Sequence, residues 1–135
     1  MDVKEIKELS KYRFEKALAN IETSRFLFKS QNYAVALNRA YYAAFDAMRA
    51  INALDGFDSS KHSGVIAHFN QNYVKSKLFP IETSSIIRKA SMLREKSDYE
   101  DFYQPSEEET IDVIEEVESF LENVKKYLTQ NGVLQ

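Results

Sequence analysis

One segment of the chain spaces its apolar residues as a buried helix does. Between residues 33 and 51 they recur at steps of four and three, at Tyr33, Leu37, Tyr41, Ala44, Met48 and Ile51. Because an α-helix turns once in about 3.6 residues, these side chains share one face, which must pack against other helices. A half-buried strand would instead alternate apolar and polar residues. The segment therefore favours an all-α fold.

The same periodicity predicts four further helices, at residues 2–29, 62–77, 82–103 and 107–130. Asp2 with Glu5, and Ser106 with Glu109, have the spacing of a capping box at a helix start. The expected apolar stripe of the first helix is Phe14, Leu18, Ile21 and Phe28.

Short breaks separate these helices, and short connections imply antiparallel neighbours. Asp55-Gly56 has the composition of a turn, because glycine tolerates a positive φ. We expect an antiparallel up-and-down bundle of four to five helices, with the short third helix as an elaborated crossover. Residues 1–135 are expected to form a single domain, since this length suits one hydrophobic core.

Composition excludes several classes of function. The chain has no cysteine, which removes disulfides and cysteine-ligated zinc and fits a cytoplasmic protein. No signal-peptide pattern or membrane-spanning run of about 20 apolar residues occurs, so we expect no contact with a membrane. The three glycines are isolated, so no phosphate-binding loop forms. No Glu-x-x-His pair is present, and the two histidines stand six apart, so we expect neither a metal nor a cofactor.

The net charge of −3 conceals an uneven distribution. Residues 61–96 contain seven Lys/Arg and two Asp/Glu, whereas residues 97–135 contain two and eleven. A polyanion would meet the basic middle segment. Alternatively, basic and acidic helices pair with each other, within a protomer or across a dimer.

Residues 36–45 place small alanines beside paired tyrosines, a composition typical of close helix packing. Tyr41 belongs to the core face of the helix. Tyr42, Asn38 and Asp46 lie on its flank, where they would line a polar groove or a subunit contact.

The end of the fourth helix carries a second candidate group. Arg94 and Asp98 stand four residues apart, so their side chains meet on one helix face. On the surface they would form an ordinary ion pair. In a buried setting the planar guanidinium would suit a phosphate or a carboxylate, and Tyr99 would add a hydroxyl.

Three stretches together resemble the HEPN family (higher eukaryotes and prokaryotes nucleotide-binding), in its small stand-alone prokaryotic branch. They are Ala-Leu-Asn-Arg-Ala-Tyr-Tyr-Ala-Ala-Phe at 36–45, Lys61-His62-Ser63-Gly64-Val65, and Arg94 through Asp98-Tyr99. The resemblance implies a helical bundle that commonly forms a homodimer. It also implies frequent pairing with a nucleotidyltransferase in toxin–antitoxin systems.

Many members of that family are metal-independent ribonucleases whose motif is an arginine and a later histidine with four to six residues between them. This chain departs from the motif, because the residues five to seven after Arg94 are Tyr99, Glu100 and Asp101. No arginine stands at the matching distance before His62 or His68. No catalytic residue is therefore carried over, and the chain is not expected to be an enzyme of the ordinary HEPN type.

Three hypotheses remain. The first is a binding module, the partner of a nucleotidyltransferase in a toxin–antitoxin-like pair, that binds nucleotide, RNA or protein through a cleft containing Arg94. The ligand-binding residues would be Arg94, Asp98, Tyr99, Tyr42 and Asp46. The second is a metal-independent endoribonuclease that uses Arg94 with Tyr99 or His62 as an unusual acid or base. The third is a purely structural interaction bundle.

Overall fold

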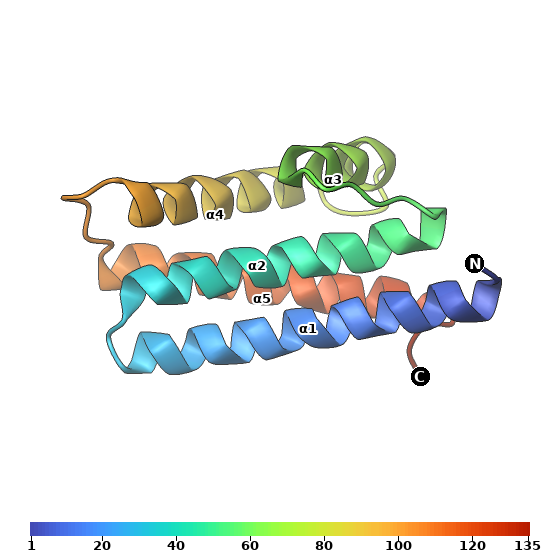
Figure 1. Cartoon of the computed structure of the whole chain (residues 1–135), viewed down its shortest axis with the longest axis horizontal. Coiled ribbons are helices and arrows are strands. Elements are labelled where there is room, and N and C mark those ends of the chain that lie inside the picture. The colour runs from blue at the N-terminus through green and yellow to red at the C-terminus, as the bar shows by residue number, and fades with distance from the viewer.

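The computed structural model describes residues 1–135 and confirms the all-α fold. The α-helices are α1 (Val3–Lys29), α2 (Tyr33–Asn52), α3 (His62–Phe69), α4 (Glu82–Tyr99) and α5 (Glu107–Gln130). A 3₁₀ turn, Ala53–Asp55, follows α2, and a π-helical turn, Asn70–Val74, follows α3. The four long helices run alternately up and down, with α3 at one end of the bundle, as Figure 1 shows.

Helix α2 lies at the centre of the bundle and contacts α1, α3, α4 and α5. Its alanines explain how so many neighbours fit, since Ala40, Ala43, Ala44 and Ala47 have no exposed surface. Small side chains let neighbouring helix backbones approach closely. The apolar residues on both sides of α2 are thus buried within one chain, and they leave no large apolar face on that helix for a second copy.

Local sequence signals set the helix ends. Asp2 caps α1 through the predicted capping box, with its carboxylate accepting from the Glu5 backbone N–H at 2.8 Å. Gly56 ends the 3₁₀ turn in the left-handed conformation, at φ 70°, as the Asp55-Gly56 turn predicts. At α5 only half of the predicted box forms. Ser106 accepts from the Glu109 N–H at 3.0 Å, but the Glu109 carboxylate accepts from the hydroxyls of Ser106, at 3.3 Å, and Tyr103, at 2.6 Å, and not from the Ser106 backbone N–H.

The predicted ends of two helices were wrong in detail. The third α-helix ends at Phe69 rather than at 77, because the chain continues as a π-turn whose Lys75 N–H donates to the Asn70 carbonyl. The fourth helix ends at Tyr99, before 103.

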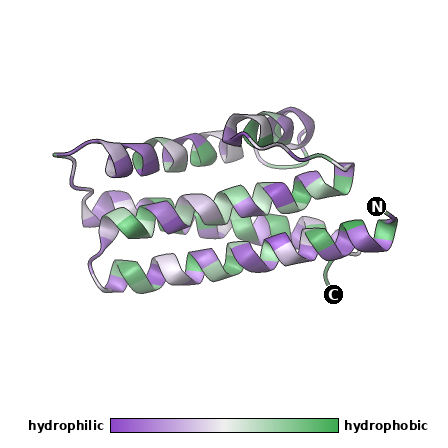
Figure 2. Cartoon of the chain, viewed as in Figure 1, coloured by the Kyte–Doolittle hydropathy of each residue, from purple (hydrophilic) through white to green (hydrophobic).

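On α1, Leu18 is 43% exposed, while its neighbour Ala17 is fully buried. Phe14 and Ile21 of the predicted stripe are buried and Phe28 is partly buried, so Leu18 alone of the four lies outside the packed face, where Ala17 contributes instead. Figure 2 shows the resulting mixture of apolar and polar residues along each long helix.

The uneven charge is partly balanced inside the chain. Glu118 of α5 accepts two hydrogen bonds from Arg25 of α1, at 2.7 and 2.9 Å. Glu116 of α5 pairs with Lys89 of α4 at 2.9 Å. The acidic last helix thus neutralises part of its basic neighbours within one protomer. No helix in the structure combines the length and the apolar character that crossing a membrane requires.

Candidate functional site

Tyr41, in the middle of α2, is the floor of the candidate site. Its side chain is 1% exposed, and its hydroxyl lies 3.0 Å from Nδ1 of His62, the first residue of α3. Burial raises the pKa of Tyr41, so the phenol keeps its proton at neutral pH. A protonated phenol both donates and accepts, so it can bond either tautomer of His62.

Arg94 of α4 lies on the same tyrosine. Its guanidinium carbon is 4.8 Å from the centre of the Tyr41 ring and 5.8 Å from that of Tyr42. Both distances fall within the range of a cation–π contact, and burial strengthens such contacts. Arg94 is only 8% exposed, yet its Nε has no hydrogen-bond partner. A buried donor of a charged group is normally paired, so this N–H is an unsatisfied donor within the group.

His62 completes the group. Its ring centre lies 4.3 Å from that of Phe45 and 5.7 Å from that of Tyr42. Burial lowers the pKa of His62, and the positive charge of Arg94 lowers it further. The imidazole is therefore mostly neutral at neutral pH, the state in which a histidine accepts a proton. Two rings, those of Tyr41 and Tyr42, contact both His62 and Arg94, and the arginine is near enough for its charge to lower the pKa of the histidine.

Asp98 lies at the edge of this group, one turn after Arg94. Its Oδ2 is 3.5 Å from the Arg94 Nη1 and accepts from the Asn38 amide of α2 at 3.2 Å. The contact with Arg94 is long for a strong ion pair, so Asp98 orients the guanidinium without saturating it. Asn38 in turn accepts from Arg39, at 2.6 Å.

Asp46 lies on the other side of Tyr42, toward α1. It is 6% exposed and accepts from the Asn20 amide at 2.9 Å. Burial raises the pKa of Asp46, although Lys16 and the Asn20 bond oppose the shift. Asn20 also accepts from Arg39, whose guanidinium carbon lies 5.2 Å from the Tyr42 ring centre. Asp46 is thus linked to the Arg94 group indirectly, through Asn20 and Arg39, and Arg39 in turn contacts Tyr42 and Asn38.

The structure does not bring Tyr99 to this group. The side chain is 75% exposed and borders a shallow hollow with Met92 and Glu95 of the same helix. Of the predicted residues, Arg94, Asp98, Tyr42 and His62 come together. Asp46 lies one step away, and Tyr99 lies on the outer surface.

Sequence reasoning assigned Tyr41 to packing alone and therefore missed its polar role. Its hydroxyl connects α2 to α3, which a helical period cannot reveal. Gly64 is a second residue whose role was not evident. A Cβ built there would lie 2.5 Å from the Ser59 Oγ, and that hydroxyl accepts from the Lys61 N–H at 3.2 Å. The backbone at Gly64 therefore passes close to the Ser59 side chain, at the point where α3 begins with His62.

The arrangement provides three functions in one place. Arg94 offers a positive charge and an unpaired N–H, which suit a phosphate oxygen. His62 offers a neutral imidazole that can take up or release a proton. Tyr41 holds the imidazole ring through one nitrogen and leaves the other ring nitrogen for a ligand.

Comparison with known proteins shows the family of the chain. The family model described as HEPN domain matches residues 10–127. Two proteins of Methanocaldococcus jannaschii, each named a putative toxin, are 30% and 34% identical, over 99% and 94% of this chain and 90% and 94% of their own lengths. A UPF0332 protein of Thermotoga maritima is 30% identical over 92% of this chain and 94% of its own length. The matched region contains every residue of the site described above, and the chain belongs to the HEPN family.

Proposed function

We propose that this chain is a toxin-like HEPN module that binds RNA through the group formed by Arg94, His62, Tyr41 and Tyr42. One observation carries the proposal: a buried arginine with an unpaired N–H lies beside a neutral histidine on a shared tyrosine floor. Two relatives named as putative toxins support the toxin-like role. As the resemblance implies, the physiological partner in this proposal is a nucleotidyltransferase that restrains the module in a cytoplasmic toxin–antitoxin pair.

RNA suits the group better than a free nucleotide or a protein ligand. The single arginine would bind one phosphate of the strand, and an unstacked base could lie against exposed parts of the tyrosine and histidine rings. Arg88 of the same helix is exposed and would add positive charge for an adjacent phosphate.

Binding of a fluorescently labelled single-stranded RNA tests this proposal. We expect Arg94→Gln to weaken binding at least tenfold, since it removes a charge-assisted contact. Arg88→Gln on the same helix is the matched control, and we expect it to weaken binding about twofold. Equal affinities of wild type and Arg94→Gln would refute the proposal.

The position of His62 favours a second candidate function, metal-independent RNA cleavage. In this hypothesis His62 removes the proton from a ribose 2′-hydroxyl, and Arg94 stabilises the negative charge that develops on the attacked phosphate. His62 comes from α3, so it would replace in space the histidine that α4 lacks.

Incubation of purified protein with total cellular RNA and a metal chelator tests cleavage. This second function predicts products with wild type and none with His62→Gln or Arg94→Gln. If the products persist in both variants, a contaminating nuclease made them. If wild type makes none, binding alone remains.

We also propose that the module forms a homodimer, through the outer face of α4. Three apolar side chains on or just after that helix are exposed: Met92 at 59%, Tyr99 at 75% and Phe102 at 99%. Exposed apolar side chains of this kind commonly mark an interaction surface. Sedimentation of wild type and Met92→Glu gives the test, and a monomeric wild type would contradict the proposal.

A further inference from the structure

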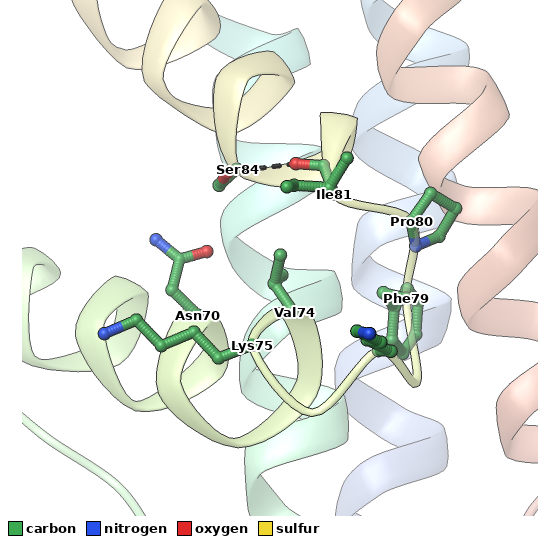
Figure 3. A pocket seen from close by; sticks show the side chains of 8 residues that line it. Asn70, Val74, Lys75, Phe79, Pro80, Ile81 and Ser84 are labelled. Carbon is green, nitrogen blue, oxygen red and sulfur yellow. Dashed lines mark hydrogen bonds between the residues drawn. The ribbon is translucent and has the colours of Figure 1, made fainter.

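A hollow lies between the π-turn and the start of α4, at the opposite end of α3 from His62. Its volume is about 780 Å³, within the range of small-molecule sites. Figure 3 shows Val74 at its centre, Phe79 and Pro80 on one side, and Ile81 at the start of α4. Phe79 is 3% exposed and forms a fixed floor, whereas Ile81 is 78% exposed and forms an unprotected apolar edge. The wall offers apolar contact that the chain itself does not use.

The polar part of the lining has one sign of charge. Lys75 and Lys77 border the hollow, and none of its eight lining residues is acidic. Figure 3 shows the Lys75 ammonium and the Asn70 amide nitrogen on the same side of it. Two donors beside an apolar floor suit an anionic group attached to an apolar body.

The backbone around the hollow is held in uncommon conformations. The π-turn is closed by the Lys75 N–H to the Asn70 carbonyl at 2.9 Å. Lys77 has a φ of 68°, a left-handed conformation that costs free energy in a residue other than glycine. Such turns and strained residues concentrate at functional sites.

Asn70 adds an unpaired group. Its Oδ1 is buried and has no hydrogen-bond partner, so the chain does not fix this amide. The amide is therefore free to turn toward a bound head group.

We propose that this hollow binds a small amphiphilic anion. Its apolar chain would lie on Val74, Phe79 and Ile81, and its single phosphate or carboxylate head would be held by Lys75 with the Asn70 amide. Lys77 adds to the positive potential. The site is separate from the Arg94 group, because the two share no residue.

Titration of the ¹⁵N-labelled full-length protein with octyl phosphate, followed by amide chemical shifts, tests the site directly. We expect saturable shifts confined to residues 70–84. Affinity should rise roughly two- to fourfold for each methylene added between hexyl and decyl phosphate, as buried apolar area requires. Octanoate in a parallel titration distinguishes a carboxylate head from a phosphate head, and octyltrimethylammonium controls for the chain alone.

Two variants separate the two halves of the site. Lys75→Ala with Lys77→Ala should weaken octyl phosphate at least tenfold. Ile81→Asp should do the same by introducing a negative charge, and its exposed position at the start of α4 tolerates aspartate. Lys61→Ala, at the other end of α3, is the matched control and should bind as wild type does. Unsaturable shifts, equal binding of the cationic amphiphile, or unchanged affinity in both lining variants would overturn the proposal.

Discussion

At the scale of single residues, the environment of His62 governs the chemistry of the site. Burial and Arg94 both lower its pKa, with burial the larger cause. We expect Arg94→Gln to raise the pKa of His62 part of the way back to its ordinary value of about 6.5, because burial remains. NMR titration of the imidazole measures this, and Arg88→Gln should leave the titration unchanged. A His62 pKa that is the same in wild type and Arg94→Gln would mean that the two side chains are not neighbours.

The same shift predicts how stability depends on pH. The folded pKa of His62 lies below its unfolded value, so the unfolded chain binds this proton more tightly. The contribution of His62 to stability is therefore present above about pH 6.5 and is lost as the pH falls through the folded pKa. Urea unfolding of wild type and His62→Gln between pH 5 and 8 measures it, and the difference between the two proteins should grow toward neutral pH. A difference that does not vary with pH would contradict the prediction.

We expect Asp46 to affect the pH dependence of stability in the opposite direction. Its pKa is raised, so its ionised form costs stability once the pH rises through the folded pKa. Asp46→Asn keeps an oxygen that accepts from the Asn20 amide and removes the buried charge. We expect this variant to be more stable than wild type at pH 7, with the gain disappearing at acid pH, in thermal unfolding across that range. A less stable Asp46→Asn at pH 7 would show that the charge is balanced by Lys16 and the nearby arginines.

The sequence alone indicated most of the site residues, but it did not indicate that they lie together. Arg94, Asp98 and His62 were candidates from their types and motifs. Tyr41 connects His62 with Arg94, and these two residues stand far apart in the sequence. A helical period shows which residues share a face of one helix, but it does not show which faces meet.

At the scale of elements, the start of α3 depends on a close approach between Gly64 and Ser59. We expect Gly64→Ala to destabilise the protein by about 1–3 kcal/mol, because its Cβ would overlap the Ser59 side chain. Denaturant unfolding measures the cost. Ser59→Gly removes the obstructing atoms, so Gly64→Ala should cost much less in that background. Equal costs in both backgrounds would place the origin elsewhere.

The helices of the bundle were predictable because the spacing of apolar residues and the capping residues act locally. The bounds of α5 were predicted correctly, and those of α1 and α2 to within about a residue. The π-turn was not, because long-range aromatic packing selects it. Phe69, Tyr73 and Phe79 form T-shaped and stacked contacts with one another, and Phe69 and Phe79 also contact Phe120 of α5.

At the scale of the whole molecule, the net charge of −3 gives little indication of where RNA would bind. The acidic α5 neutralises Arg25 and Lys89 within the chain, and the Arg94 group keeps a positive charge on the α2–α4 side. We expect the affinity for single-stranded RNA to fall with salt with a shallow slope, about −0.7 for each phosphate contacted and so roughly −1.4 for the two phosphates that Arg94 and Arg88 would meet. Anisotropy titrations at several salt concentrations give the slope. A salt-independent affinity would exclude phosphate contacts.

The central claim is that Arg94 and His62 act on one ligand. A double-mutant cycle on RNA affinity tests it most directly, with wild type, Arg94→Gln, His62→Gln and the double variant. Each single change should weaken binding, and the double variant should bind about as weakly as Arg94→Gln alone, which gives a coupling above about 0.5 kcal/mol. Strictly additive losses would mean that the two residues act independently, and unchanged affinity in the double variant would show that RNA does not bind at this site.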